Sequence, residues 1–259
     1  MVDCLEDMVL VITGAASGIG RAIAERAVER GAVKLLLTDM DKQGLQKAAS
    51  DLPSHVQVAT IIADLSDATA ADKITEAAIS TYGRIDGLVN SAGVTTRASF
   101  MDGTSEDWDR IFAINARAPY LLMQAAIKDM LSRKSQGSIV NIQSVNAQCG
   151  IAELAIYSAS KGALQTLTKN AANAHMGDGI RVNGINLGWT LTEAENHMQA
   201  NILGLGENWT ADAAKDTPLG RLLQPEEAAN LTVYLLDPVS APLSGASIDL
   251  TQGVVGAPS

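Results

Sequence analysis

The segment Met8-Val-Leu-Val-Ile-Thr13-Gly14-Ala-Ala-Ser-Gly18-Ile-Gly20 decides how this chain folds. It begins as a short apolar run rich in β-branched residues, which is typical of a buried strand. A turn with three glycines follows, and residues 21–28 then have helical periodicity. Such a turn lets the backbone approach a phosphate, and the helix after it presents free N–H groups and the positive end of its dipole. A purely structural tight turn is the alternative.

A second strand pattern at residues 33–38 ends at Asp39, nineteen residues after Gly20. An acidic residue at this distance is where a dinucleotide-binding unit bonds the adenosine ribose. A carboxylate accepts hydrogen bonds from both ribose hydroxyls and repels a 2′-phosphate. No arginine or lysine follows directly after Gly14 or stands at position 40, and Lys42 is the nearest cation. The sequence therefore favours NAD over NADP.

Strand and helix patterns alternate along the rest of the chain. Further strands are predicted at 56–62, 86–90, 138–143, 180–186 and 247–250, and helices at 69–81, 105–131, from 157 onward, and at 225–236. Each strand–helix pair is a right-handed crossover unit, and a run of them builds a parallel sheet. No interdomain linker is visible. We therefore predict an α/β fold, a single doubly wound Rossmann domain over residues 1–259 with about seven parallel strands flanked by helices on both faces.

Tyr157 and Lys161 lie four residues apart at the start of a helical pattern, so their side chains share one face. A phenol with a pKa near 10 is a poor base at neutral pH, and a cation beside it stabilises the phenolate. Ser144 stands thirteen residues before Tyr157, at the carboxyl end of a predicted strand, where open α/β sheets place ligands. Any helix can carry Tyr and Lys at this spacing, so the pair gains meaning only beside a redox cofactor.

Asn115 is an unusual residue for the interior of the long helix predicted at 105–131. Pro119 has no N–H, so it frees the carbonyl four residues before it, which is that of Asn115. A released carbonyl at this position suits a bound water, and we predict that Asn115 takes part in a proton relay. Asp64, at the end of the third strand, has two interpretations: contact with an adenine amino group, or the cap of the following helix.

The composition excludes several classes of function. The chain has 259 residues, 47% of them hydrophobic, and a formal net charge of −10. That charge argues against a nucleic-acid or anionic-membrane partner. The apolar runs are too short to span a bilayer, and the first residues lack a signal pattern, so we expect a cytoplasmic protein. The three histidines share no ligand spacing, so no metal is expected.

Taken together, the motifs resemble the classical short-chain dehydrogenase/reductase family from end to end. The matching pieces occur in the family's order and spacing: Thr13-Gly14-x-x-x-Gly18-x-Gly20, Asp64, Asn90-Ser-Ala-Gly93, Asn115, Ser144 and Tyr157-x-x-x-Lys161. The resemblance implies an NAD-dependent oxidoreductase and a homo-oligomer, either a tetramer or a dimer.

The resemblance also implies a role for each matching residue. Tyr157 would be the general acid and base, and Lys161 would lower its pKa and hold the nicotinamide ribose. Ser144 would bond the substrate oxygen, and Asn115 would anchor a water relay behind Lys161. The implied cofactor-binding set is Gly14, Ser17, Gly18, Ile19, Gly20, Asp39, Asp64, Leu65, Asn90, Ala92, Gly93, Tyr157, Lys161, Gly188, Thr190 and Thr192.

Three positions depart from the family pattern. Leu187 stands where proline is usual before Gly188, so we expect a less rigid turn there. Gln143 replaces a small residue directly before Ser144, with an effect that the sequence does not predict. Thr251-Gln-Gly253 replaces Asp-Gly-Gly after the last strand, which puts details of a subunit interface in doubt.

The substrate is predicted from polar residues that flank the catalytic set, namely Asn146, Glu153, Trp189 and Arg97. An apolar substrate would leave such groups unpaired, at about 1–3 kcal/mol each. A small polyol, sugar or sugar acid would satisfy them, and Arg97 favours the acid. The alternative is that several of these side chains point to solvent. Residues 190–217 are predicted to form a lid over the substrate.

Three other functions stay open at this point. The first is a dehydrogenase for simple secondary alcohols. The second is a regulator that senses NAD without reacting, because fold does not imply function; the intact catalytic set argues against it. The third is a lyase or epimerase that uses NAD catalytically, but such relatives usually carry an extra substrate domain that this length does not allow.

Overall fold

One parallel sheet runs through the whole described part of the chain, residues 5–253 of a computed structural model. Its strands are β1 (Val9–Thr13), β2 (Lys34–Asp39), β3 (Gln57–Ile62), β4 (Gly87–Asn90), β5 (Gly137–Ser144), β6 (Ile180–Leu187) and β7 (Ser247–Leu250). The strand order is β3-β2-β1-β4-β5-β6-β7, and every pair is parallel. The order reverses between β1 and β4, so a crevice opens at their carboxyl ends.

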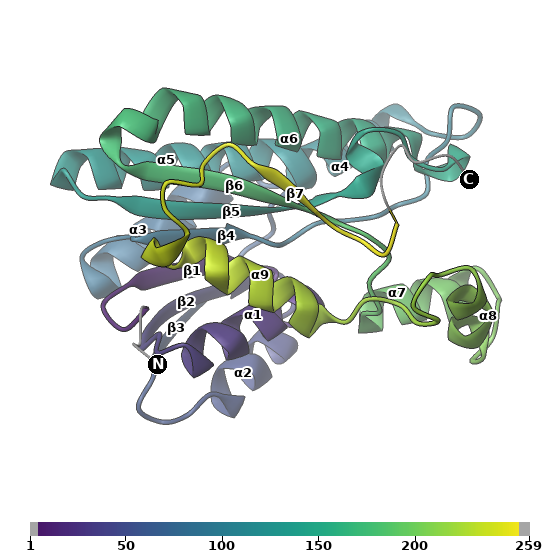
Figure 1. Cartoon of the computed structure of the whole chain (residues 1–259), viewed down its shortest axis with the longest axis horizontal. Coiled ribbons are helices and arrows are strands. Elements are labelled where there is room, and N and C mark those ends of the chain that lie inside the picture. The colour runs from purple at the N-terminus through teal and green to yellow at the C-terminus, as the bar shows by residue number, and fades with distance from the viewer. Residues whose placement is uncertain (1–4, 254–259) are drawn as a thin grey trace.

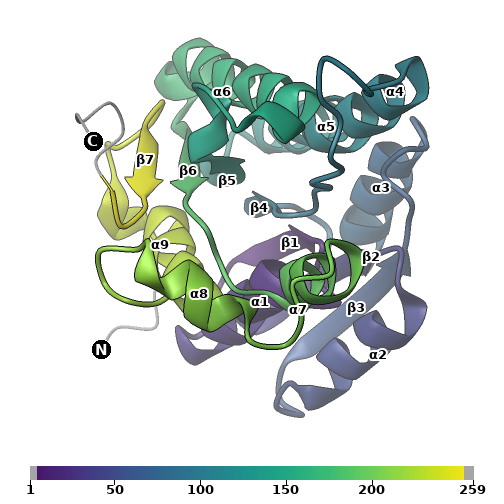
Figure 2. The same cartoon turned by 90° about the vertical axis from the view of Figure 1, so that its right-hand side faces the viewer.

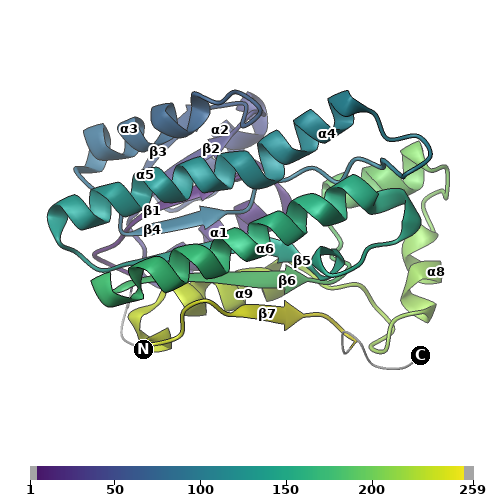
Figure 3. The same ribbon diagram turned by 90° about the horizontal axis from the view of Figure 1, so that it is seen from above.

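Helices cover both faces of this sheet, which confirms the predicted doubly wound fold. They are α1 (Gly18–Glu29), α2 (Lys42–Asp51), α3 (Ala70–Tyr82), α4 (Ser105–Phe112), α5 (Ala118–Arg133), α6 (Ala155–His175), α7 (Glu193–His197), α8 (Trp209–Lys215) and α9 (Pro225–Leu236). α3, α5 and α6 lie on one face, and α1, α2 and α9 lie on the other (Figures 1 and 3). The short helices α7 and α8 stand apart, beyond the carboxyl ends of the strands (Figure 2).

The alternation of side chains along each strand produces two cores, one under each helical layer. Leu10 and Ile12 of β1 point to the α1 side, while Val11 between them packs with Ile74 of α3 and Leu122 of α5. All of these side chains are fully buried, and nearly all of the core is aliphatic. Among the described helices, none combines the length and the apolarity needed to cross a membrane.

The long helix predicted at 105–131 is interrupted in the structure. A π-helical segment, Ala113–Arg117, separates α4 from α5, and the N–H of Ala118 donates to the carbonyl of Ala113, five residues back. Pro119 stands at the start of α5, where its missing N–H and fixed backbone are tolerated. The prediction of one continuous helix was wrong in this respect. The wider turn places Asn115, which is fully buried, opposite α6.

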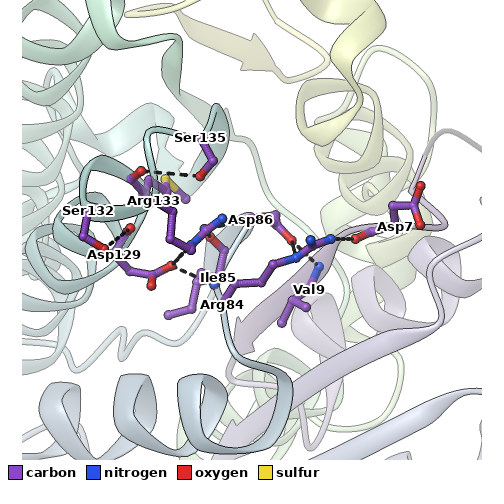
Figure 4. A network of polar contacts seen from close by, with 10 residues as sticks. Asp7, Val9, Arg84, Ile85, Asp86, Asp129, Ser132, Arg133 and Ser135 are labelled. Carbon is purple, nitrogen blue, oxygen red and sulfur yellow. Dashed lines mark hydrogen bonds and ion pairs between the residues drawn. The ribbon is translucent and has the colours of Figure 1, made fainter.

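A polar network at the amino ends of β1 and β4 ties the sheet to α5 (Figure 4). The carboxylate of Asp86 accepts from the N–H of Val9 at 2.9 Å and forms ion pairs with Arg84 at 2.8 Å and Arg133 at 3.5 Å. Arg133 also pairs with Asp129, one turn earlier on α5, at 2.9 Å. The single carboxylate of Asp86 therefore joins β1, β4 and α5. It lies at the amino ends of the strands, opposite the carboxyl ends where the crevice opens.

Candidate active site

A cleft follows the carboxyl ends of β2, β1 and β4, where the strand order reverses. It passes from the end of β2 across the glycine turn to the loop after β4, and α7 borders it. The lining residues are Gly14, Ser17, Gly18, Ile19, Gly20, Thr38, Asp39, Met40, Ala63, Asp64, Leu65, Ser91, Ala92, Gly93, Val94, Ile114, Thr192 and Ala194. Most residues of the predicted cofactor set therefore line one cleft.

The glycine turn packs so closely that side chains would not fit. A Cβ on Gly20 would collide with the carbonyl oxygen of Gly14, and Gly14 itself has φ of 68°. Ser17 precedes α1 without capping it through its side chain, so the first N–H groups of α1 face the cleft without a side-chain acceptor. This cradle fits the pyrophosphate of a dinucleotide.

Asp39 is fixed at one end of the cleft by two backbone donors. Its carboxylate accepts from the N–H of Ala16 at 3.1 Å and from that of Asp41 at 3.0 Å. Asp64 accepts from the N–H of Ser66 at 2.8 Å, whereas α3 begins only after Thr69. Asp64 therefore closes a tight turn on the cleft wall and does not cap α3.

Tyr157 and Lys161 lie in the first turns of α6, and both are buried. Lys161 Nζ donates to the carbonyl of Ile142 on β5 at 2.8 Å and lies 5.8 Å from the Tyr157 ring centre. A Cβ built on Gly93 would lie 3.4 Å from Lys161 Nζ and 3.3 Å from Asn115 Oδ1. Gly93, which lines the cleft, therefore lies next to Lys161 and Asn115; their catalytic roles stay a prediction.

Burial disfavours the charged forms of both residues of the pair. It raises the pKa of the Tyr157 phenol, which a hydrogen bond with Ser144 lowers in part. The Glu195 carboxylate raises the pKa of Tyr157 further, and the Arg97 guanidinium lowers it. Burial also lowers the pKa of Lys161 to about 8. In the protein without cofactor, the pKa of the Tyr157 phenol is therefore raised, mainly by burial.

The side chain of Asn115 forms hydrogen bonds with two other segments of the chain. Its Oδ1 accepts from the N–H of Val94 at 2.9 Å, and its Nδ2 donates to the Val94 carbonyl at 2.9 Å and to Ser160 Oγ at 3.1 Å. The side chain thus holds the loop after β4 against α6. The relay through the main-chain carbonyl of Asn115 stays a prediction.

Asn90 and Thr13 support the wall of the cleft from behind through side-chain hydrogen bonds. Asn90 is buried, and its Nδ2 donates to Asn141 Oδ1 on β5 at 2.8 Å, so its side chain supports the sheet and does not line the cleft. Thr13 Oγ1 accepts from the N–H groups of Ser91 and Ala92, both at 3.1 Å. This function of Thr13 was not predicted, although its position directly before Gly14 was a signal.

The last three residues of the implied cofactor-binding set, Gly188, Thr190 and Thr192, follow β6. Thr192 caps α7 by accepting from the N–H of Glu195, and its methyl group lies beside Gly18 across the cleft. Thr190 is buried and donates to the carbonyl of Gly188 at 3.1 Å. Gly188 is packed against Thr251, so a side chain there would not fit. Of this group only Thr192 lines the cleft.

The four predicted substrate residues are not equally placed. Arg97 is half-buried, and its positive charge lowers the pKa of the Tyr157 phenol. The N–H of Asn146 donates to Ser144 Oγ at 3.1 Å. Trp189 is 43% exposed and donates through Nε1 to Glu195 at 2.8 Å. Glu153 is exposed, and its carbonyl accepts from the N–H of Ala98. The alternative that a side chain points to solvent therefore holds for Glu153.

Two departures from the family pattern gain an explanation. Gln143 lies over Gly184 on β6, where a Cβ would overlap its amide, and Gln143 Nε2 donates to Thr168 Oγ1 of α6 at 2.8 Å. Leu187 continues β6 and is paired on both sides, with Ser144 and Leu250. The strand thus reaches the residue where a proline would have ended its pairing.

The altered segment after β7 also has identified contacts. Gln252 Oε1 accepts from the N–H of Leu219, and Gln252 Nε2 donates to the carbonyl of Arg221. This side chain therefore joins the end of the described chain to the segment after the predicted lid. Within residues 5–253, no three His, Cys, Asp or Glu side chains gather as a metal site would need.

Comparison with known proteins agrees with this geometry. A family model described as enoyl-(acyl carrier protein) reductase, adh_short_C2, matches residues 14–255. A 2-(S)-hydroxypropyl-CoM dehydrogenase of Xanthobacter autotrophicus is 36% identical, with 96% of this chain and 97% of the relative covered. The chain belongs to the short-chain dehydrogenase/reductase family. It is therefore an oxidoreductase of secondary alcohols or ketones, and a regulator without chemistry is not supported.

Other members of the short-chain dehydrogenase/reductase family cover a range of substrates. A meso-2,3-butanediol dehydrogenase of Serratia marcescens is 33% identical, with 96% of this chain and 94% of the relative covered. Two solved structures each have a TM-score of 0.89 and cover 96% of this chain and 98% of theirs. They are levodione reductase, 29% identical, and a variant of actinorhodin polyketide ketoreductase with NADPH, 27% identical. A nicotinamide cofactor is typical of this family, and its members differ in substrate.

Proposed function

We propose that this protein is an NAD-dependent dehydrogenase that oxidises a secondary alcohol of a small polyol, sugar or sugar acid. The observation that carries the proposal is the cleft itself, with Asp39 at one end and the buried pair Tyr157 and Lys161 at the other. A dinucleotide laid along the cleft would place its ribose at Asp39 and its nicotinamide at the pair.

Tyr157 Oη would take the hydroxyl proton of the substrate, and Ser144 Oγ would donate a hydrogen bond to the same oxygen. A bound NAD supplies the acceptor for the hydride that leaves the carbinol carbon. Lys161 would stabilise the phenolate form of Tyr157 through its charge. The main-chain carbonyl of Asn115 would hold the water through which the proton leaves, behind Lys161.

The choice of NAD rests on charge at the ribose end of the cleft. Asp39 and Asp64 are the charged lining residues, and no arginine or lysine lines the described cleft. Arg21, directly after the glycine turn, is bound to Glu25 at 2.9 Å and to Asp51 at 2.7 Å. A 2′-phosphate would therefore meet a carboxylate and no free cation.

Replacement of Asp39 tests the choice of cofactor. Asp39→Ala should raise KM for NAD at least tenfold while KM for NADP changes less, because charge-assisted bonds to the ribose are lost and repulsion of the phosphate ends. Asp41→Ala is the control, since Asp41 caps α2 and does not line the cleft. An unchanged ratio of the two KM values in Asp39→Ala would refute the NAD assignment.

The substrate class follows from the polar surroundings of Tyr157, with Arg97, Trp189 and Asn146 nearby. The butanediol dehydrogenase among the relatives acts, by its name, on a small diol. The test is NADH production at alkaline pH with sugars, sugar acids, alditols and simple secondary alcohols. Reaction with hydrophobic secondary alcohols alone would leave a simple alcohol dehydrogenase as the function.

A further inference from the structure

The carboxylate of Glu195, on α7, is held in one orientation by two donors. Trp189 Nε1 donates to its Oε1 at 2.8 Å, and Gln199 Nε2 donates to the same oxygen at 2.7 Å. Gln199 is buried, so its amide is committed to this contact. The second oxygen, Oε2, accepts no hydrogen bond from the residues that the structure describes.

Neighbouring side chains make this arrangement rigid. Trp189 packs against Trp209 with ring centres 5.6 Å apart, and Trp209 Nε1 donates to Asn196 Oδ1 at 2.8 Å. The Glu195 N–H donates to Thr192 Oγ1, at the start of α7. A carboxylate on such a support keeps its position without the entropy loss of an exposed side chain.

Glu195 also stands beside the cleft, on the helix that borders it. Ala194 and Thr192, its neighbours on the chain, line the cleft, and α7 lies beyond the carboxyl ends of the strands (Figure 2). Three side chains change the pKa of the Tyr157 phenol. A hydrogen bond with Ser144 and the positive charge of Arg97 lower it, and the negative charge of Glu195 works in the opposite direction. Glu195 raises the pKa of that phenol, which by itself opposes alcohol oxidation.

A carboxylate that is held in place beside the cleft and has one oxygen free is suited to accept a hydrogen bond from a bound substrate. We propose that Glu195 determines substrate specificity: its free Oε2 accepts a hydrogen bond from a second hydroxyl group of the substrate, on the carbon next to the one that is oxidised. The inference rests on the proposed dehydrogenase function and narrows its substrate to a vicinal diol unit. A substrate with a single hydroxyl would leave the carboxylate without this donor.

The competing explanation is that Glu195 only fixes α7. Glu195→Gln separates the two, because glutamine keeps an acceptor oxygen for Trp189 and Gln199 but loses the charge and half of the acceptor capacity. Glu193→Gln is the matched control: Glu193 lies on the same helix, is exposed, and forms no side-chain hydrogen bond or ion pair within the described chain.

The experiment compares kcat/KM with NAD for butane-2,3-diol and for butan-2-ol in the wild type and both variants. In Glu195→Gln the ratio of diol to mono-alcohol should fall about tenfold or more, the loss expected for one hydrogen bond to a charged group. The rising limb of the pH profile should move to lower pH with both substrates. Glu193→Gln should change neither quantity.

Other outcomes would overturn the inference. An unchanged ratio in an active Glu195→Gln enzyme would refute it, and a weaker NADH affinity with an unchanged ratio would assign Glu195 to the cofactor. If Glu195→Gln does not fold, Glu195→Asp takes its place. Aspartate keeps the charge, but its shorter side chain moves the oxygens away from the substrate, so the ratio of diol to mono-alcohol should fall. A wild type that oxidises no alcohol would refute the proposed function, and this inference with it.

Discussion

Tyr157 and Lys161 are both buried, and burial disfavours the charged form of each side chain. The pKa of Tyr157 is raised by burial, and oxidation needs its deprotonated form. Since a base with a raised pKa gains its active form only at higher pH, we expect kcat/KM for alcohol oxidation to keep rising from pH 7 into the alkaline range. The pH profile of the free enzyme measures this. A plateau reached below pH 8 would contradict it.

Replacement of the Tyr157 hydroxyl tests its role directly. Tyr157→Phe should lower kcat by about a thousandfold or more, because general acid–base catalysis typically contributes 10²–10⁴. NADH affinity, followed by the fluorescence of the bound cofactor, should stay nearly unchanged. Turnover that survives at a tenth of the wild-type rate would show that another group moves the proton.

Thr168, in the middle of α6, joins two buried amides. Its Oγ1 accepts from Asn141 at 2.9 Å and from Gln143 at 2.8 Å, and donates to the carbonyl of Leu164. Thr168→Val would leave two buried donors unpaired and should cost about 2–4 kcal/mol in the free energy of unfolding. Thr232→Val is the control, since buried Thr232 only donates to Ala228 within α9, and should cost less than about 1 kcal/mol. Equal losses, measured by urea unfolding, would contradict this account.

At the scale of elements, the strands and the glycine turn were predictable because their signals are local. Val9–Thr13 and Lys34–Asp39 are apolar, of strand length, and followed by turn residues, and the structure confirms them. The spacing from Gly20 to Asp39 then places the acidic residue at the cleft, which the structure also shows. These features depend on neighbours along the chain and so appear in the sequence.

Contacts between distant segments were not predictable in the same way. The side chain of Asn90 bonds Asn141 within the sheet, because both residues stand at paired positions of β4 and β5. The π-helical segment depends on the packing of Asn115 against Val94 and Ser160, not only on Pro119. Thr192 and Ala194 line the cleft beside the glycine turn, although they are far from it along the chain. Each of these depends on tertiary packing that no local pattern records.

Asp86 joins β1, β4 and α5, so its loss should loosen the amino ends of both strands (Figure 4). Asp86→Ala leaves Arg84 and Arg133 without their shared carboxylate, and we expect a loss of about 2–4 kcal/mol in the free energy of unfolding. Asp7→Ala is the control, because Asp7 contributes only its carbonyl to Arg84. Activity at saturating substrate should be preserved in both variants, since the network lies far from the cleft.

For the whole molecule, one sheet that includes strands from both ends of the described chain predicts cooperative unfolding. Tryptophan fluorescence reports α4 through Trp108 and the predicted lid through Trp209, with Trp189 directly before the lid. Far-UV circular dichroism reports all the helices. We expect both transitions to coincide in urea, as one domain requires. An earlier fluorescence transition would mean that residues 190–217 unfold separately.

Light scattering at two protein concentrations would test the expected homo-oligomer.

The contact of Gln143 with Gly184 also couples the residues that positions 143 and 184 can hold. A Cβ at position 184 would overlap the glutamine amide, so a larger residue there requires the Gln143 side chain to leave its present place and its bond to Thr168. A small residue at position 143 would remove this overlap. A side chain at position 184 and the present position of Gln143 therefore compete for the same space, whereas position 143 can become small without any change at 184.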